Sequence, residues 1–382
     1  MKKILIFYAS YGGGHLSAAN AIKQYIDTNY SEIYKTQLTD CMQYVNKPIN
    51  KITTTAYKEM AKKFPWAWGE FYYHAKKGPI AHISSASNKI LARKLLDLLD
   101  EYDPDIVIST HPFATQMISY LKKKGLIDCL LATVLTDFAP HEQWIVGKDF
   151  VDLFFVSHSK MRQELIYDYD IPENKIFATG IPLSNKFLKN YNKKLLRESF
   201  GLDITKKLIL FFGGGEFGLG KDKTLSILKS FIKHSNGKLQ IVAISGKNNR
   251  LKKHFKELVE ELNAGDFVKV LGFTNQVPEL MSISDLVVTK PGGLTSSESL
   301  ASGLPMVVIN PIPGQEEENA EFLESSNVAI WIKKDDDCDE IISSLLDNTE
   351  KLREMKINTK ILAKRNSTKD ICETIISHFQ TR

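Results

Sequence analysis

The sequence predicts an α/β protein built from two doubly wound domains, each a parallel sheet covered by helices. Three observations carry this prediction. The chain of 382 residues is too long for one ordinary hydrophobic core. Short, nearly continuous apolar runs alternate with helical patterns, as in parallel sheets that are buried on both faces. A strand followed by three glycines occurs near the start and again near the middle, at residues 12–14 and 213–215.

The first half begins with an apolar strand at residues 4–8, which leads into the first glycines and then into a helix. The helix is indicated by apolar residues that recur every three or four positions: Leu16, Ala19, Ile22 and Ile26. Two further β-rich runs follow at 106–109 and 131–135. This order is the first part of a doubly wound sheet.

The second half repeats the plan, with strands expected at 207–212, 240–244, 268–271, 286–288 and 306–309. We expect domains at residues 1–190 and 191–365. A basic segment after Gly180-Ile181-Pro182 joins them, and a last helix at 366–382 packs back on the first domain. Ligands belong beyond the carboxyl ends of the strands, where the glycine turns lie.

Composition indicates a globular protein, with 43% hydrophobic and 25% charged residues. The net charge of +5 would suit an anionic surface or substrate. Four isolated cysteines (Cys41, Cys129, Cys338 and Cys372) lack the spacing of a zinc site or a disulfide framework, which favours a reducing cytoplasm. The apolar start ends at Ala9 without a cleavage site, and no run is long enough to span a bilayer. Any membrane contact is therefore expected to be peripheral.

The two glycine turns can hold phosphate, because backbone N–H groups and the helix dipole attract anions there. The alternative is that they are only tight turns. The dinucleotide fingerprint fits poorly, since the first turn lacks its final glycine, although Asp40 lies where a ribose-binding acid could be. His15 falls in the first turn of the helix, where the dipole favours the neutral base and suits proton abstraction from an alcohol. A purely structural cap is the alternative for His15.

The stretch 289–323 is the most specific in the sequence. A strand leads to Pro291-Gly292-Gly293 and a helix for which we expect Thr295 or Ser296 as the cap. Glu298 then falls in the first turn, where a carboxylate is stabilised and can accept the paired hydroxyls of a ribose. Three side chains suited to sugar hydroxyls begin the next helix: Gln315, Glu316 and Asn319. Ordinary compensation of the dipole is the alternative for the two glutamates.

Residues 57–83 mix aromatic and basic side chains, a composition suited to the headgroup region of an anionic membrane. The residues expected to touch the membrane are Lys62, Lys63, Trp66, Trp68, Lys76 and Lys77. A nucleic-acid surface would also mix these types, but no binding motif accompanies them, so no nucleic acid is expected. The alternative is that the rings pack inside and the lysines are solvated.

The segments "SYGGGH", "GGGEFG", "SGKN", "LGFTNQV" and "KPGGLTSSESLASGLPMVVINPIPGQEEENAEFL" make the chain resemble the diacylglycerol glycosyltransferases. That family comprises monogalactosyldiacylglycerol synthase and the bacterial processive diacylglycerol glucosyltransferases. A more distant resemblance is to the transferase that adds N-acetylglucosamine to the peptidoglycan lipid precursor. The resemblance implies a GT-B fold, with two Rossmann-like domains facing each other across a cleft. It also implies an acceptor domain, then a nucleotide-sugar domain, and inversion without a metal or cofactor.

Carried over by position, the resemblance makes His15 the catalytic base. It implies an acceptor side formed by Gly13, Gly14, Asp137, His141 and Trp144, to which His111 is added because it follows a strand end of the same half. It implies a donor site formed by Gly214, Gly215, Glu216, Lys247, Phe273, Val277, Gly293, Thr295, Glu298, Gln315, Glu316 and Asn319. The peptidoglycan enzyme has glutamine where Glu316 stands, which puts that substrate in doubt. From the residues alone, His111 and His141 either line the same cleft or satisfy loop carbonyls.

The expected activity is transfer of glucose or galactose from its UDP derivative onto diacylglycerol, at the inner face of the cell membrane. The expected partners are a UDP-sugar, diacylglycerol and an anionic phospholipid surface. The alternatives are N-acetylglucosaminyl transfer to a polyprenyl-linked precursor, a sugar-nucleotide epimerase on the same scaffold, and a sensor without turnover. The sequence leaves open the choice of hexose, the number of sugars added and the oligomeric state.

Overall fold

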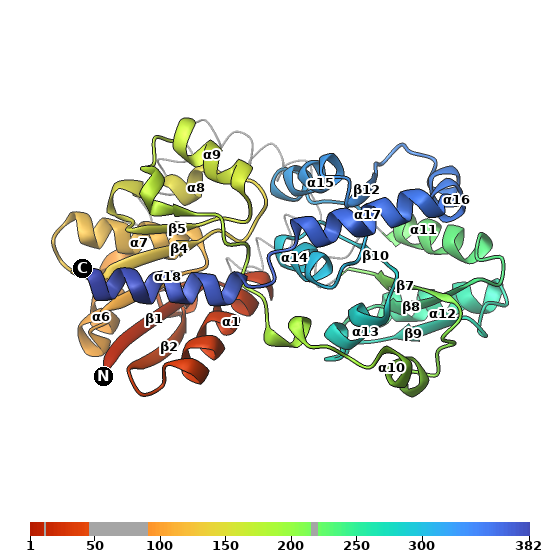
Figure 1. Ribbon diagram of the computed structural model, residues 1–382, viewed down its shortest axis with the longest axis horizontal. Helices are drawn as coiled ribbons and strands as arrows, with labels where there is room; N and C mark the ends of the chain where they lie inside the picture. The colour runs from red at the N-terminus through yellow and green to blue at the C-terminus, as the bar shows by residue number, and fades with distance from the viewer. Residues whose placement is uncertain (11–12, 46–90, 215–220) are drawn as a thin grey trace. The chain divides into compact units, whose positions relative to one another are not determined.

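The computed structural model describes residues 1–10, 13–45, 91–214 and 221–382. The chain divides into two compact units (Figure 1). The first contains Met1–Ser184, Pro313–Gln315 and Lys364–Arg382, and the second contains Asn185–Ile312 and Glu316–Ala363. The division at 184/185 falls six residues before the expected one. Helix α18 (Ser367–Thr381) belongs to the first unit, where it packs against α1 (Gly13–Asn29).

The described part of the first unit contains a six-stranded parallel sheet in the order β2-β1-β3-β4-β5-β6. Its strands are β1 (Lys2–Tyr8), β2 (Tyr34–Asp40), β3 (Ile106–Ser109), β4 (Leu130–Val134), β5 (Leu153–Phe155) and β6 (Ile176–Phe177). Its other α-helices in the described ranges are α2 (Cys41–Val45), α6 (Leu96–Tyr102), α7 (Pro112–Lys123), α8 (Glu142–Ile145) and α9 (Ser159–Tyr167). In register, Tyr8 lies opposite Asp40 and Phe7 lies opposite Ser109.

Both faces of this sheet are buried, as the apolar runs predict. Alternate side chains of β1 point to opposite faces, so Leu5 and Phe7 join one core while Ile4 and Ile6 join the other. The first core is completed by α6, α7 and α9, and the second by α1 and α18. Ile371 and Ile375 of α18 lie fully buried against the face that α1 also covers.

The second unit contains another six-stranded parallel sheet in its described residues, in the order β12-β11-β10-β7-β8-β9. Its strands are β7 (Lys207–Phe212), β8 (Leu239–Ile244), β9 (Val268–Leu271), β10 (Leu286–Thr289), β11 (Met306–Ile309) and β12 (Ala329–Ile332). Its described α-helices are α10 (Lys193–Ser199), α11 (Lys221–Lys233), α12 (Asn249–Glu261), α13 (Val277–Ile283), α14 (Gly293–Ala301), α15 (Gln315–Ser325), α16 (Cys338–Asp347) and α17 (Thr349–Leu362). The strand order is that of the dinucleotide-binding Rossmann sheet. The predicted class, two doubly wound α/β domains, is confirmed.

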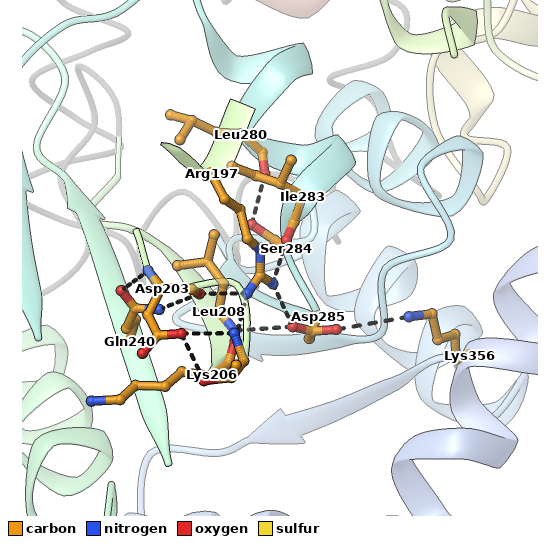
Figure 2. A network of polar contacts seen from close by, with 11 residues as sticks. Arg197, Asp203, Lys206, Leu208, Gln240, Leu280, Ile283, Ser284, Asp285 and Lys356 are labelled. Atoms are coloured by element: carbon orange, nitrogen blue, oxygen red, sulfur yellow. Dashed lines mark hydrogen bonds and ion pairs between the residues drawn. The ribbon is translucent and has the colours of Figure 1, made fainter. Parts of the chain in front are cut away.

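Arg197 of α10 makes hydrogen bonds to residues at the amino ends of two strands of the second sheet, β7 and β10 (Figure 2). Its guanidinium donates to the carbonyl oxygens of Lys206 (2.5 Å) and Ile283 (2.8 Å) and to Asp285 Oδ2 (3.1 Å). The same Asp285 oxygen accepts the Leu208 N–H at the start of β7. One planar cation therefore joins α10, β7 and the residue that precedes β10.

No helix in the described ranges is long and apolar enough to cross a bilayer.

Candidate functional site

In each sheet the site lies where the strand order reverses. The first sheet turns back between β1 and β3, and the second between β7 and β10. A crevice forms outside the carboxyl ends of two strands whose connections leave in opposite directions. The loop after β1 leads to His15 and the loop after β3 carries His111. The two loops of the second sheet begin with Gly213 and Lys290.

His15 is held by the loop that follows β3. Its Nδ1 lies 2.7 Å from the carbonyl oxygen of Thr110, and Thr136 Oγ1 lies 3.1 Å from the same nitrogen. A carbonyl oxygen can only accept, so Nδ1 carries the proton and Nε2 has a free lone pair. The Thr110 hydroxyl donates to the backbone oxygen of His15 at 2.9 Å. The ring is therefore fixed in the tautomer that a general base at Nε2 requires.

His111 has the opposite tautomer. It is the N-cap of α7, where its Nδ1 accepts the backbone N–H of Phe113 at 3.2 Å. The proton of this neutral ring is therefore on Nε2. The rings of His15 and His111 meet edge to face, with centroids 4.6 Å apart. The two neutral rings therefore carry their protons on different nitrogens, Nδ1 in His15 and Nε2 in His111.

Burial keeps both imidazoles neutral. It lowers the pKa of His15 to about 4, against the bond to the Thr110 carbonyl, which favours the protonated ring. Burial also lowers the pKa of His111 far below its ordinary value, and the neighbouring histidines His15 and His141 add to this. The sequence predicts a neutral His15 from the helix dipole, and the structure makes desolvation the main cause.

The loop after β4 completes this side of the sheet. It carries Thr136, the buried Asp137 and Phe138, whose carbonyl oxygen accepts the His158 Nε2–H at 2.8 Å. His158 Nδ1 in turn accepts the Met161 N–H and so caps α9. Gly13 and Gly14 are the first two residues of α1, beside His15.

Trp144 does not lie on an open surface. Its side chain is fully buried in the core between the sheet and α7. Its ring lies 6.0 Å from that of His141. The tryptophan can therefore shape the acceptor side by supporting His141, while direct contact with a ligand would require it to move.

Asp40 does not support the dinucleotide alternative. One of its carboxylate oxygens accepts the N–H groups of Met42 and Gln43, each at 3.0 Å, at the start of α2. The other oxygen accepts the Ser10 hydroxyl in the loop after β1. Both oxygens serve the local fold, so Asp40 is not available to bind a ribose.

In the second unit, the turn after β7 depends on its glycines. A Cβ on Gly213 would lie 2.6 Å from Leu251 Cδ2 and 2.7 Å from Phe255 Cζ, both on α12. Gly214 has a φ of +89°, which only glycine adopts readily. Close packing and a left-handed turn therefore both require glycine here. Gly215 and Glu216 lie outside the described residues.

Helix α14 begins earlier than the sequence suggests. It runs from Gly293 with Gly292 as the N-cap, so the expected cap at Thr295 or Ser296 is wrong. Thr295 is the third helical residue, and no side chain in the described ranges caps the helix. The N–H groups of the first turn, which no described side chain caps, are suited to bind an anion. Proline and glycine can start a helix without a capping side chain, which the pattern of serines concealed.

Glu298 is consequently in the second turn of α14, outside the region where the dipole stabilises a carboxylate. Burial raises the pKa of its carboxyl to about 8. Among the described residues this side chain has no hydrogen-bond or ion-pair partner. The expected stabilised carboxylate is therefore wrong for the ligand-free protein, in which the group is mostly protonated at neutral pH.

Two side chains of α15 shape the loops around α14. Glu316 Oε2 accepts the Ile312 N–H at 2.7 Å and lies 3.4 Å from Lys290 Nζ. Asn319 is fully buried and donates to the Pro291 carbonyl oxygen at 3.0 Å. Asn319 thus braces the loop before α14. Gln315, the first residue of α15, is half-buried.

Phe273 presents an open aromatic face, with 63% of its surface exposed. The Lys247 ammonium lies 5.4 Å from the centre of this ring. Val277 begins α13 a few residues later. An exposed ring beside a helix start is suited to cover a flat heterocyclic base.

The predicted membrane residues, Lys62, Lys63, Trp66, Trp68, Lys76 and Lys77, also lie outside the described ranges. Within those ranges, no group of three or more His, Cys, Asp or Glu side chains is placed to hold a metal ion.

Sequence reasoning missed Thr110, Thr136 and Lys290. The first two hold His15, and Lys290 pairs with Glu316. Each follows the end of a strand by one or two residues, at the edge where ligands bind in such sheets. That position was a usable signal for all three.

Comparison with known proteins agrees with the division of the chain into two units. Residues 15–183 match the family model described as "Monogalactosyldiacylglycerol (MGDG) synthase", and residues 192–361 match "Glycosyl transferases group 1". Over 375 residues the chain is 31% identical to the processive diacylglycerol beta-glucosyltransferase of Bacillus pumilus (strain SAFR-032), covering 98% of this chain and 94% of that protein. The chain belongs to the diacylglycerol glycosyltransferase family. The corresponding protein of Bacillus subtilis (strain 168) is 30% identical, with 99% and 96% covered.

Solved structures support the fold of this family member. Acinetobacter baumannii MurG superposes with a TM-score of 0.66 at 15% identity, covering 99% of this chain and all of that one. The UDP-GlcNAc 2-epimerase of Neisseria meningitidis gives 0.64 at 16% identity, with 99% and 100% covered. At such low identity the likeness concerns the fold alone, and it confirms the predicted GT-B class.

Proposed function

We propose that this diacylglycerol glycosyltransferase moves a hexose from UDP-hexose onto the free hydroxyl of 1,2-diacylglycerol, with inversion to a β-glycoside. The observation that carries the proposal is the near full-length likeness to processive diacylglycerol beta-glucosyltransferases. A second observation supports the proposal: the His15 imidazole lies at the crevice of the first sheet and is held through Nδ1, so that Nε2 keeps its lone pair. An alcohol acceptor needs such a base, since its hydroxyl is a weak nucleophile at neutral pH.

In the proposed reaction His15 Nε2 accepts the proton of the lipid hydroxyl as its oxygen attacks the anomeric carbon. The bond from that carbon to the UDP oxygen breaks on the opposite face, so the configuration inverts. A positioned base contributes roughly 10²- to 10⁴-fold in rate. The carbonyl of Thr110 stabilises the imidazolium that forms, because it already accepts the Nδ1–H.

We propose that the second unit stabilises the negative charge that develops on the leaving UDP. The turn at Gly214 and the start of α14 at Gly293 and Thr295 would supply N–H donors that need no cation. Gly215 and Glu216, which lie outside the described residues, are expected to bind the same diphosphate. A reaction without a metal or cofactor is therefore part of the proposal.

The remaining donor contacts follow from side-chain chemistry. Glu298 would accept the ribose hydroxyls once its carboxyl loses the proton, and Phe273 with Lys247 and Val277 would cover the uracil. Gln315 and Glu316 would contact the hexose, while Asn319 would hold the loop before α14. The acceptor would lie by Gly13, Gly14, His111, Asp137 and His141, with Trp144 behind them.

Glucose is the better supported hexose. The family model named for galactolipid synthesis matches residues 15–183, whereas the relatives named for glucose transfer match nearly the whole chain, including the donor half. We further propose that the protein works at the inner face of the cell membrane, attached peripherally, because the acceptor is a bilayer lipid. The lysines and aromatics of residues 57–83 would take part in this contact.

The test is incubation of the purified protein with diacylglycerol and one donor at a time: UDP-glucose, UDP-galactose or UDP-N-acetylglucosamine. Mass spectrometry and NMR of the lipid product would identify the sugar, the number added and the anomer. We expect β-glucosyldiacylglycerol. Conversion of UDP-N-acetylglucosamine without an acceptor would instead indicate an epimerase. Binding of every donor without turnover would indicate a sensor, and transfer only to a polyprenyl-linked acceptor would replace diacylglycerol.

A further inference from the structure

Two of the segments in which the chain passes between the two units, around residues 184/185 and 363/364, are basic. Residues 186–197 contain five lysines and arginines without an acidic residue, and residues 356–369 again contain five without an acidic residue. The second passage includes the last two turns of α17. Such a local excess of one charge in a chain of net charge +5 indicates an anionic partner.

The two basic stretches meet on the second unit. Asp285 lies between them, with Arg197 at 3.1 Å on one side and Lys356 at 3.9 Å on the other (Figure 2). Lys193 of α10 faces the same group. Burial lowers the pKa of its amine, and the positive charges of Lys356, Arg197 and Lys360 lower it further, against Asp285. Two cations, Arg197 and Lys356, therefore pair with one carboxylate, and two further lysines, Lys193 and Lys360, add positive charge nearby.

Large aliphatic side chains stand beside these cations. Ile357 is 47% exposed and Ile361, one turn later on α17, is 76% exposed. Lys356 and Lys360 are one turn apart next to them, because residues four apart lie on the same side of a helix. We call the set of Lys193, Lys356, Ile357, Lys360 and Ile361 the α17 surface. Aliphatic side chains flanked by lysines are typical of helices that lie in the headgroup region of a bilayer.

We propose that the α17 surface docks on a bilayer that contains anionic phospholipid. The lysines would pair with headgroup phosphates, and the two isoleucines would enter the boundary between headgroups and acyl chains. A nucleic acid is disfavoured, because aliphatic side chains do not stack on bases. The choice of a bilayer rests on the proposed function, whose acceptor is a membrane lipid. The residues of the α17 surface are distinct in sequence from residues 57–83.

The α17 surface lies at the end of the second sheet away from its donor loops. Lys356 approaches Asp285 just before β10, and the Lys360 side chain passes beside Gly303, just after α14. These positions are at the amino ends of the strands, whereas the glycine turns follow their carboxyl ends. Docking there would leave the donor loops open to UDP-sugar from water, and substitutions there should not disturb the donor site.

The experiment measures sedimentation of the full chain with phosphatidylcholine vesicles, with and without phosphatidylglycerol. Diacylglycerol and UDP-sugar are absent. Each lysine near an anionic surface contributes about a fivefold factor in binding. Lys356→Gln/Lys360→Gln should therefore weaken binding to the anionic vesicles about thirtyfold. Ile357→Ser/Ile361→Ser should weaken it about tenfold, since two partly inserted aliphatic side chains are lost.

Matched controls remove the same chemistry elsewhere on the second unit. Lys253→Gln/Lys256→Gln takes two charges from α12, and Leu195→Ser/Ile204→Ser takes two exposed aliphatic side chains, which are 60% and 53% exposed. Both controls should bind anionic vesicles like the wild type. Thermal unfolding of every variant should match the wild type, which separates lost docking from lost folding.

Equal losses in the variants and their controls would overturn the proposal. So would tighter binding of the wild type to single-stranded nucleic acid than to anionic vesicles, governed by the same two lysines. Failure of the proposed function gives a different result, namely no hexose transfer to detergent-dispersed diacylglycerol by the wild type. If the function is right, the α17 variants keep wild-type turnover on that dispersed acceptor and lose it only on vesicles.

Discussion

The crevices of the two sheets have the same topology, but burial acts on them with opposite consequences. In the first, it lowers the pKa of His15 to about 4, so the imidazole is already in the unprotonated form that a base requires. In the second, it raises the pKa of Glu298 to about 8, so most of that carboxyl is protonated and cannot accept two hydroxyls. Burial in a low-dielectric environment thus favours the reactive form of His15 on the acceptor side, and it disfavours the ribose-binding form of Glu298 on the donor side.

The difference teaches where binding energy has to be used. His15 has fixed partners in Thr110 and Thr136, whereas Glu298 has none among the described residues. If ribose hydroxyls donate to Glu298, they supply the hydrogen bonds that favour the carboxylate. Proton release from Glu298 should then accompany UDP binding, and the second crevice should become complete only when the donor is present.

The largest effect is expected from His15→Ala, which should lower turnover at least about a hundredfold while UDP affinity stays near the wild-type value. Steady-state kinetics and calorimetric titration with UDP measure the two quantities. Added imidazole should restore part of the turnover, because a small base can occupy the vacated space. Near wild-type turnover, or loss of folding without rescue, would make His15 a structural residue.

The pH profile sharpens the same point. A folded pKa of about 4 means that His15 is unprotonated above that pH, so kcat/KM should fall only as pH drops towards 4. A normal histidine would produce the decline near pH 6.5. Initial rates between pH 4 and pH 8, on a background where the protein stays folded, distinguish the two. A decline centred on pH 6.5 would contradict the neutral, buried imidazole.

An intermediate effect is expected at Glu298. With a pKa of about 8, its ionised fraction rises about tenfold between pH 7 and pH 9, so UDP affinity should rise by about the same factor. Glu298→Gln should remove this rise, and 2′-deoxy-UDP should reduce it by removing one donor hydroxyl. Titration in buffers of different ionisation enthalpy should reveal protons released on binding at pH 7. Identical pH profiles for wild type and Glu298→Gln would move the ribose elsewhere.

A smaller effect is expected at Phe273. Loss of one exposed stacking face is worth about 1 kcal/mol, so Phe273→Ala should weaken UDP and UDP-glucose alike by about fivefold. Phe273→Tyr keeps the ring and serves as the control, with affinity close to that of the wild type. If Phe273→Ala changed the turnover but not the affinity for UDP, the ring would belong to the acceptor side and not to the donor site.

No effect is expected from removing divalent cations. If backbone donors and helix termini stabilise the leaving UDP, transfer should proceed at the wild-type rate after treatment with a chelator. The control is the same reaction with Mg²⁺ restored. Loss of activity on chelation and recovery on addition would show that the second crevice needs a cation, and would remove the metal-free part of the proposal.

Much of the fold could be read from local pattern. The strands predicted at 106–109, 207–212, 268–271 and 306–309 coincide with β3, β7, β9 and β11. Strands β2, β5, β6 and β12 were not anticipated. β2 carries polar residues and is an edge strand of the first sheet, and β12 is an edge strand of the second sheet. β5 and β6 are only three and two residues long. Such strands exist because a neighbour supplies their hydrogen bonds, which is a tertiary cause.

The site divides in the same way. The sequence placed His15 in the first turn of α1 and Gln315 and Glu316 at the start of α15, because glycine turns and helix periodicity are local. It gave no sign that the side chains of Asn319 and Trp144, which suit a ligand by chemistry, are fully buried, and their predicted roles stay predictions. Exposure depends on residues far along the chain, so no local pattern could report it.

By itself the sequence determined the two doubly wound domains, the glycine turns and the histidine at the start of α1, since each follows from spacing and backbone freedom within a few residues. Only the tertiary structure decided which nitrogen of His15 carries its proton and which form of Glu298 exists at neutral pH. The tautomer depends on the carbonyl of Thr110, 95 residues away in the chain. The protonation depends on how much water the packed loops and helices exclude from Glu298, and that exclusion is a property of the assembled unit.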